Sequence, residues 1–455
     1  MRQGFPNDDA SRRAFPGAGK AHPDTMPAAT PLEYLATALF ALAVLHTFSV
    51  PVFARLAHRN GPHAGVWHFM SEVEAVFGIW AFALLVGMAA LTGLPSMVEY
   101  LDTRNFTEPL FVFAIMVVAA SRPIIDLVGR VVHAIARVLP VQRELATFFV
   151  ILSVVPLSGS FITEPAAMTL AALLLRGAYF QRPGQEGFKY LALGVLFVNI
   201  SIGGVLTAYA APPVLMVAGT FGWDSGYMAT HFGWRAAVAV TLNALVLTLV
   251  ARRALLDGDV GEDRRATPRH GADPKQLPVP FAVIVVHLVF LVGIVLSAHH
   301  PPLFLGLLML FIGFCEAYKR YQSRLMIKEG LMVGFFLAGL VVLGGLQKWW
   351  LQDLLGGLSP TVLFWGATAL TAVTDNAALT YLGSLVEGTS EAWRLMLVAG
   401  AVTGGGLTVI ANAPNPAGFA ILKGAFPGGT ISAGRLFLAA LGPTAVAALM
   451  FLLPV

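Results

Sequence analysis

Apolar residues gather in long runs along this chain, and short polar connections separate the runs. A run of about 17 to 25 apolar residues is long enough to cross a bilayer as a helix. The runs lack the two-residue alternation of a membrane β-barrel, so the pattern predicts an all-α polytopic membrane protein. Candidate spans, several of them short or broken, lie near residues 32–54, 73–94, 108–120, 144–157, 188–211, 235–256, 279–298, 302–318, 329–347, 360–373, 393–411 and 434–454.

Composition supports a membrane location. Hydrophobic residues make up 57% of the chain and charged residues only 12%, which is more apolar than a soluble protein of this length requires. The net charge of +4 is what basic cytoplasmic loops produce, so nucleic acid is not expected as a partner. The only cysteine, Cys315, excludes an intrachain disulfide and a thiolate metal cluster. No cofactor is expected.

Two polar stretches divide the chain. Residues 1–31 are rich in Pro, Gly and Asp and lack the features of a signal peptide, so they are expected to form a disordered polar tail. Residues 257–277 carry many charges of both signs and are expected to form a solvated linker. This division predicts a first transmembrane repeat at residues 32–256 and a second at residues 278–455.

The two predicted repeats contain the same motifs in the same order. Residues 162–170 read ITEPAAMTL and residues 373–381 read VTDNAALTY, which places Glu164 and Asp375 211 positions apart. A second related stretch follows each motif. These stretches contain the expected helix breaks at Gly203, Gly204 and Pro213 in the first repeat and at Gly404, Gly405 and Pro414 in the second. Such duplication within apolar sequence is typical of secondary transporters.

Positive charge predicts how the repeats are oriented. Arginine and lysine residues gather in the loops near residues 55–59, 122–143, 252–275 and 319–328, which are therefore expected to be cytoplasmic. On this assignment the span at 32–54 begins outside, whereas the span at 279–298 begins inside. The sequence thus predicts two inverted-topology repeats.

Proline and glycine beside Glu164 are incompatible with an ordinary transmembrane helix. Non-helical backbone at membrane depth must be buried in protein or must line a wet cavity, so we expect two re-entrant hairpins and two discontinuous helices. Inverted repeats would bring the hairpin tips together near the midplane as an oxygen-rich cation site. The candidate ion- and proton-binding residues are Thr163, Glu164, Asn199, Thr374, Asp375, Asn376 and Asn412, with Glu164 and Asp375 as the carboxylate ligands for Na⁺.

A carboxylate in a low dielectric takes up protons more readily than one in water, so protons and a cation can compete for Glu164 and Asp375. This competition is the simplest basis for antiport. An alternative role for both acids is capping the helices that follow them, and a capping carboxylate can also be a ligand. Asn199 is equally compatible with a structural role in the core. His46 and His287 lie 241 positions apart. For both, we favour a role in hydrogen bonding between helices over one in proton transfer.

At these residues the chain resembles a small family of proposed bacterial sodium/proton antiporters within the wider ion-transporter superfamily. The likeness spans most of residues 32–455 and rests on the two hairpin tips and on the Gly-rich broken helices. It implies ion-binding roles for Thr163, Glu164, Thr374, Asp375, Asn376 and Asn412, and it implies a homodimer. Carboxylate carriers of the superfamily typically have Ser-Asn-Thr at the tips, and this chain departs from that pattern at both tips.

The sequence therefore predicts a secondary active transporter of the bacterial inner membrane. It would exchange sodium, or another monovalent cation, for protons by alternating access. Two other functions remain as alternatives: a carrier of organic or metalloid anions from the same superfamily, and an intramembrane enzyme. The enzyme is disfavoured because no nucleophile with a base and an orienting group stands out, and no phosphate-binding loop of an ATP-driven pump is present.

Overall fold

The computed structural model describes residues 29–59, 61–181, 185–256 and 277–453, and over these residues the regular secondary structure is helical. The expected tail and linker lie outside the described residues, apart from residues 29–31 and 277. Each predicted span coincides with a helix. These helices are α1 (Pro31–Ala57), α3 (Val73–Thr92), α5 (Thr107–Ala119), α7 (Arg143–Ile162), α9 (Glu186–Gly203), α12 (Trp234–Val250), α14 (Phe281–Leu296), α15 (Pro301–Ala317), α16 (Ile327–Gly344), α18 (Pro360–Thr371), α20 (Glu391–Gly404) and α22 (Ala433–Phe451).

Further helices lie between these. One of them, α6 (Arg122–Val138), follows α5 at a bend of 65° and has arginines on one face and buried Ile124 and Val132 on the other. Because polar and apolar residues are interspersed along it, this helix is not recognised as an apolar run in the sequence. The remaining ones are α2 (Ala64–Met70), α4 (Leu94–Asp102), α8 (Glu164–Leu175), α10 (Pro212–Phe221), α11 (Ser225–Met228), α13 (Arg252–Leu256), α17 (Lys348–Leu355), α19 (Asn376–Ser384) and α21 (Asn415–Leu422).

Local sequence determines where several helices begin. Thr30 and Glu33 form a capping box at the start of α1, in which each side chain bonds to the other residue's backbone N–H. Ser359, Ser390 and Ser432 cap α18, α20 and α22 by accepting a hydrogen bond from a backbone N–H of the first turn. These caps satisfy amide groups that a helix start leaves without partners.

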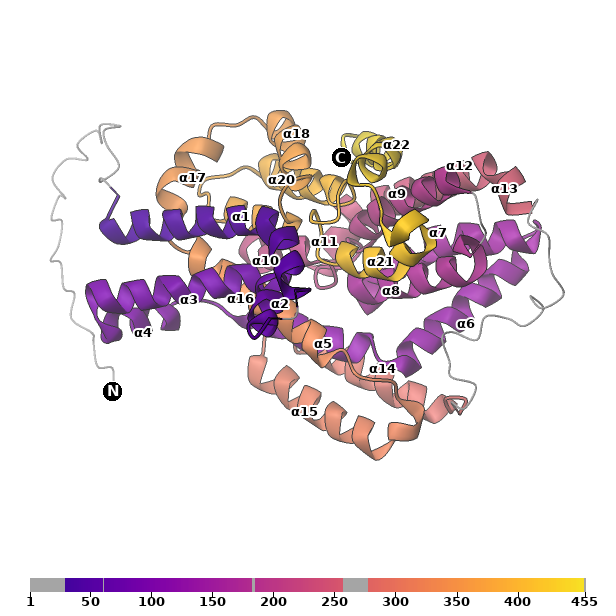
Figure 1. The fold of residues 1–455 in the computed structure, drawn as a ribbon, viewed down its shortest axis with the longest axis horizontal. Helices are drawn as coiled ribbons and strands as arrows, with labels where there is room; N and C mark the ends of the chain where they lie inside the picture. The colour runs from indigo at the N-terminus through magenta and orange to yellow at the C-terminus, as the bar shows by residue number, and fades with distance from the viewer. Residues whose placement is uncertain (1–28, 60, 182–184, 257–276, 454–455) are drawn as a thin grey trace, which may run out of the picture.

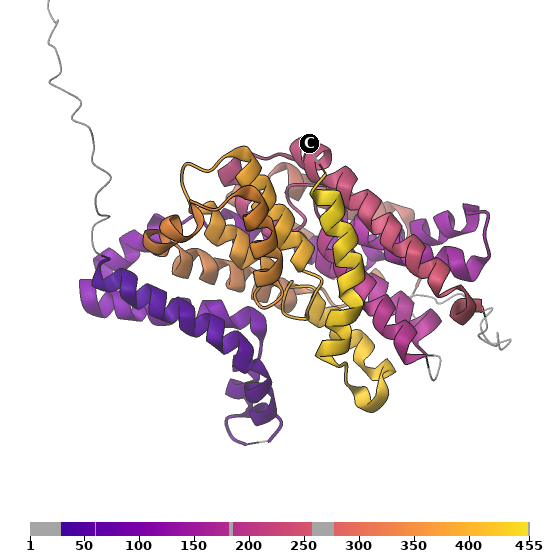
Figure 2. The same cartoon turned by 90° about the horizontal axis from the view of Figure 1, so that it is seen from above.

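The helices pack into one bundle with an extended flank (Figure 1). Helices α7, α9, α12 and α22 pack together, α18 packs on α20, and α16 packs between α3 and α5. Two short helices contact partners from the other predicted repeat: α10 packs on α19, and α21 packs on α8. Figure 2 shows α1 and α2 along one edge of the molecule. These contacts place four interruptions of the helices in the centre of the bundle. The interruptions lie between α7 and α8, between α9 and α10, between α18 and α19, and between α20 and α21.

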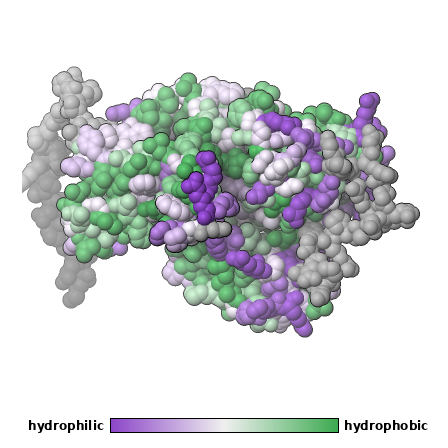
Figure 3. Space-filling view, viewed as in Figure 1, coloured by the Kyte–Doolittle hydropathy of each residue, from purple (hydrophilic) through white to green (hydrophobic). Residues whose placement is uncertain are grey.

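The protein is a multi-pass membrane protein. Over the described residues, seven helices are long and apolar enough to cross a membrane, or eight if α5 and α6 form one bent span. Large apolar side chains are exposed on the outer surface of the helices, such as Phe82 and Val86 on α3 and Met309 on the shorter α15. The face in Figure 3 is accordingly hydrophobic over wide areas. Such a surface is stable only against lipid.

The matched histidines are both buried inside the bundle. Nε2 of His46 lies 2.9 Å from the Met70 carbonyl, and Trp80 donates to its Nδ1 at 3.1 Å. Nδ1 of His287 lies 2.7 Å from the Val283 carbonyl, and its Nε2 lies 2.6 Å from Nε2 of Gln322. The prediction of histidines hydrogen-bonded between helices is therefore confirmed for His46.

Candidate functional site

The first chain break lies between α7 and α8, at Thr163. Its φ of 71° makes it the one non-glycine residue with positive φ in the described part of the chain. A β-branched residue is strained in this conformation, and such strain gathers at functional sites. The following residue, Glu164, is the first of α8 and is fully buried. The predicted interruption at Thr163 and Glu164 is thus present.

The second break lies between α18 and α19. Asp375 is the N-cap of α19, where its Oδ1 accepts hydrogen bonds from the backbone N–H groups of Ala377 at 2.8 Å and Ala378 at 3.1 Å. The alternative role of helix capping is thus present at Asp375. The first residue of α19, Asn376, is fully buried, and its backbone N–H donates to the Ala411 carbonyl at 3.1 Å.

Two further breaks interrupt longer helical paths at the predicted glycines. Helix α9 ends at Gly203 and α10 begins at Pro212, while α20 ends at Gly404 and α21 begins at Asn415. Residues 204–211 and 405–414 are irregular and mostly buried. They bring unpaired helix ends and backbone carbonyls into the interior.

Matched contacts tie each of these segments to the adjacent hairpin. The Thr207 hydroxyl donates to the Ser160 carbonyl at 2.7 Å, and the Thr408 hydroxyl donates to the Ala372 carbonyl at 2.8 Å. A Cβ built on Gly203 would collide with the Pro156 carbonyl, just as one on Gly404 would collide with the Thr368 carbonyl. Only glycine permits these close approaches.

These contacts indicate a different correspondence between the two chain breaks from the one that the motifs predict. The sequence motifs pair Glu164 with Asp375, but the first residue of α8 is Glu164 and the first residue of α19 is Asn376. Glycines confirm this register, because Gly204 faces the carboxylate of Glu164 and Gly405 faces the amide of Asn376. By position, therefore, Glu164 corresponds to Asn376, and Asp375 corresponds to Thr163.

Glu164 connects the parts of the site. Its Oε2 accepts a 2.8 Å hydrogen bond from Nδ2 of Asn412, in the irregular segment between α20 and α21. Its carboxyl group also interacts electrostatically with that of Asp375. Asn376 joins the group through its backbone bond to Ala411, the neighbour of Asn412. The structure thus brings together Glu164, Asp375, Asn376 and Asn412.

Several buried polar atoms at the site have no hydrogen-bond partner. Buried orphan groups are rare and cost about 1–3 kcal/mol each. The oxygens in question are Thr163 Oγ1, Glu164 Oε1, Asn376 Oδ1, Asn412 Oδ1 and Asn415 Oδ1. Carboxylate, amide and hydroxyl oxygens are the ligands that hard cations prefer, so this set suits a cation such as sodium. Asn415 was not among the predicted ligands; its place three residues after Asn412 was the available signal.

A cavity of about 210 Å³ adjoins the site on the Asp375 side. Asp375 and Thr374 contribute to its wall, together with apolar side chains that include Val44, Phe77 and Phe336 from α1, α3 and α16. Asp375 is half-buried, whereas Glu164 is fully buried. The two carboxylates therefore differ in their access to the space around the site.

Two predicted ligands have other bonds. The Asn199 amide donates to the carbonyls of Leu152 and Val240 and accepts from Asn243 at 2.9 Å, so its hydrogen bonds stabilise the packing of α7, α9 and α12. The Thr374 hydroxyl donates to the Leu370 carbonyl in α18. None of these bonds involves either carboxylate.

A multi-pass helical protein with a buried carboxylate at broken helices is a membrane transporter by its fold and site. A family model described as "Putative Na+/H+ antiporter" matches residues 31–454, so the chain belongs to this family. The expected family is thereby confirmed. A search of curated proteins found none that matches this sequence.

Proposed function

We propose that the protein exchanges sodium for protons at a single centre built around Glu164 and Asp375. The observation that carries this proposal is the group of unpartnered buried oxygens beside Glu164. A bound cation would satisfy these oxygens at once, and a proton on Glu164 would satisfy its free oxygen when the cation is absent. Membership of an antiporter family supports the same exchange.

The proposed ligands have distinct roles. Glu164 supplies the buried charge, Asn376 and Asn412 supply amide oxygens, and Thr163 supplies a hydroxyl. Asp375 interacts electrostatically with Glu164 and borders the adjacent cavity. It would therefore accept the cation or a proton on the way to Glu164, and its repulsion would favour loss of one charge when no cation is bound. Exchange follows because the centre holds either ions or protons.

Alternating access requires an element that moves while the site stays intact. We propose that the chain consists of two inverted repeats, residues 32–256 and 278–455, with α7–α8 and α18–α19 as re-entrant hairpins. The matched contacts of Thr207 and Thr408 with the hairpin carbonyls support this duplication. The irregular segments 204–211 and 405–414 are the natural hinges. Localisation in the bacterial inner membrane and assembly as a homodimer remain predictions.

Carriage of an organic or metalloid anion is the alternative within transporters. An anion site would present backbone N–H groups, hydroxyls and arginine, whereas the orphan atoms here are mainly acceptor oxygens, with Thr163 Oγ1 and Asn376 Nδ2 as the donors. Asp375 also occupies the amide groups at the start of α19 with its own carboxylate. The site therefore favours a cation, and the family argues for a transporter rather than an intramembrane enzyme.

The experiment is proton flux in proteoliposomes that contain a pH-sensitive dye, started by a sodium gradient without any organic anion. Intact protein should move protons in response to sodium chloride, and both Glu164→Gln and Asp375→Asn should abolish this flux. The matched control is Glu316→Gln, which removes an exposed carboxylate that pairs with Lys319 at the end of α15. Flux that needs an added carboxylate or oxyanion would support the anion carrier instead.

A further inference from the structure

A second cavity, of about 660 Å³, lies apart from the carboxylate site and has a different chemistry. It is bordered by η1 (Arg176–Phe180), which follows α8, by α9, and by the end of α21 with the chain after it. Three cationic side chains line it, Arg176, Lys189 and Lys423, and among the described residues no acidic side chain does. Concave, preformed sites with convergent charges of one sign are typical of ligand binding.

Lys189 is the buried member of this group, at only 5% exposure. Its ammonium group donates to the Ala425 carbonyl at 2.9 Å. An ammonium group has three N–H donors, so one carbonyl leaves it able to bind an anion as well. A buried lysine is rare unless a counter-charge accompanies it.

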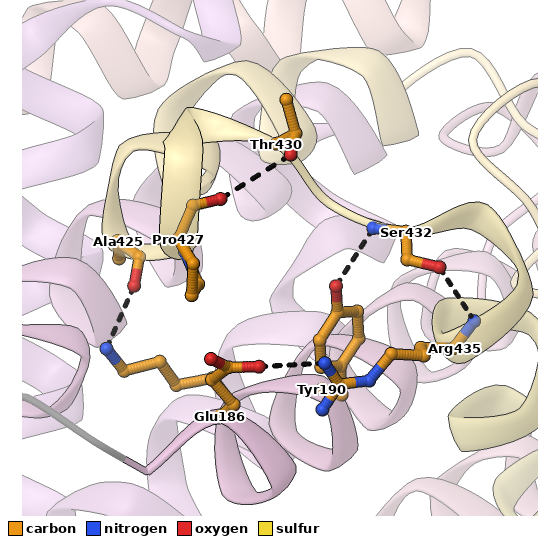
Figure 4. A network of polar contacts seen from close by, with 8 residues as sticks. Glu186, Tyr190, Ala425, Pro427, Thr430, Ser432 and Arg435 are labelled. Carbon is orange, nitrogen blue, oxygen red and sulfur yellow. Dashed lines mark hydrogen bonds and ion pairs between the residues drawn. The ribbon is translucent and has the colours of Figure 1, made fainter.

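The nearest acid already has a partner. Glu186 accepts a 2.7 Å hydrogen bond from Arg435, whose guanidinium lies over the Tyr190 ring at 4.2 Å. The Tyr190 hydroxyl accepts from the backbone N–H of Ser432 at 2.9 Å (Figure 4). These contacts fasten the chain that follows α21 to α9, so they fix the wall of the cavity, and they pair Glu186 with Arg435.

Helix ends account for only part of this charge. Arg176 begins η1 (Arg176–Phe180), which continues α8, and Lys423 begins η5 (Lys423–Ala425), which continues α21. Both therefore lie near the C-terminal ends of these helical paths, where cations are favoured. Each helix end carries roughly half a negative charge, so two ends leave about two of the three positive charges uncompensated. A doubly charged anion such as a phosphate group matches this surplus.

We propose that this cavity binds a phosphate group, from either an anionic lipid headgroup or a free phosphate ion. Arg176 and Lys423 are its exposed ligands, and Lys189 is its buried ligand. Basic pockets among transmembrane helices on the cytoplasmic side are typical lipid-headgroup sites. The positive loop charges predict that this end of the bundle is cytoplasmic.

The position of the cavity connects it to the carboxylate site. Helix α8 begins with Glu164 and is followed directly by Arg176, while α21 begins with Asn415 and is followed directly by Lys423. The two helices pack on each other. A phosphate that binds Arg176 and Lys423 together would hold the far ends of these helices, and so would favour one arrangement of their site ends. This regulatory consequence rests on the proposed function, whereas binding itself does not.

Native mass spectrometry of the purified full-length protein in detergent tests binding without any transport assay. Dioleoylphosphatidylglycerol, dioleoylphosphatidylcholine and inorganic phosphate are titrated separately against the intact protein and the variants Arg176→Gln and Lys423→Gln. The control is Arg324→Gln, which removes an exposed charge from another loop of predicted cytoplasmic location. Lys189→Met is a third variant, and the two exposed positions keep the test valid if it fails to fold.

Binding of phosphatidylglycerol, weakened roughly tenfold by Arg176→Gln or Lys423→Gln but not by Arg324→Gln, would establish a lipid site. The same pattern with inorganic phosphate, without a preference between the two lipids, would establish a free-ion site. Equal binding by the intact protein and by both exposed-site variants would overturn the proposal, as would no binding of phosphatidylglycerol or phosphate. Sodium-driven proton flux would be unaffected by that failure, so the proposed function would stand.

Discussion

The Asn412 amide donates a 2.8 Å hydrogen bond to the Glu164 carboxylate and joins residues 248 positions apart in the chain. Both residues are almost completely buried. Asn412 lies in the irregular segment before α21, and Glu164 lies at the start of α8, so the bond connects the two predicted repeats at the centre of the bundle. The two chain breaks are therefore in direct contact.

Asn412→Ala removes this bond and one of the unpartnered oxygens. A hydrogen bond to a charged group contributes about 1.5–3 kcal/mol, so we expect at least a tenfold higher sodium concentration for half-maximal flux. The measurement is the sodium dependence of proton movement in proteoliposomes. Asn105→Ala, in an exposed loop, is the control and should leave that concentration unchanged. Equal sodium dependence of Asn412→Ala and intact protein would remove Asn412 from the site.

Gly204→Ala tests how closely the irregular segment must approach Glu164. A Cβ at this position would collide with the Glu164 carboxylate, so we expect the variant to fold but to lose most of its transport. Gly187→Ala is the matched control near the start of α9, because a Cβ there meets nothing within 4 Å. That substitution should be neutral or stabilise the helix by up to about 1 kcal/mol. Normal flux in Gly204→Ala would contradict the described geometry.

Thr163 offers a test that separates stability from function. Its positive φ costs on the order of 1–3 kcal/mol, and glycine would relieve this strain at a cost of about 0.5–1 kcal/mol in chain entropy. We expect Thr163→Gly to raise the melting temperature and to lower transport, because the hydroxyl is lost. Thr163→Ser keeps the hydroxyl and should retain most of the flux. A lower melting temperature for Thr163→Gly would show that Thr163 is not strained.

The Asp375 substitutions distinguish capping from ion binding. Asparagine can cap a helix nearly as well as aspartate, whereas alanine cannot and loses about 1 kcal/mol. We therefore expect Asp375→Asn to lose transport with an unchanged melting temperature. Asp375→Ala should lose transport and also have a lower melting temperature. The comparison uses melting curves and flux on the same preparations. Full transport by Asp375→Asn would leave Asp375 with a capping role alone.

Much of the fold could be predicted because membrane helices can be recognised in a sequence as long apolar runs. All twelve predicted spans coincide with helices. Helix α6 was not predicted, because its amphipathic sequence has no long apolar run. Helices α8, α10, α19 and α21 have 12, 10, 9 and 8 residues, too few to be recognised as spans. Their packing depends on contacts between segments that are distant in the chain, and such contacts cannot be predicted from local sequence.

The site was predicted in part. The Gly and Pro signals located the breaks, because those residues act on the local backbone. The correspondence of Glu164 with Asn376 depends on which residue begins each short helix, and sequence similarity pairs Glu164 with Asp375 instead. The role of Asn199 could not be assigned from sequence either. A buried amide in an apolar run can form hydrogen bonds within the core as readily as it can bind an ion. Only the packing of α7, α9 and α12 distinguishes these roles.

If sodium and protons compete for one centre, sodium binding must release protons, and this release can be measured on the purified protein. Sodium chloride is added to purified protein in weakly buffered detergent solution, and the pH is followed with an indicator dye, with choline chloride as the ionic-strength control. Intact protein should release protons on addition of sodium alone, and neither Glu164→Gln nor Asp375→Asn should do so. Undiminished proton release by either variant would contradict the assignment of the exchange to these two carboxylates.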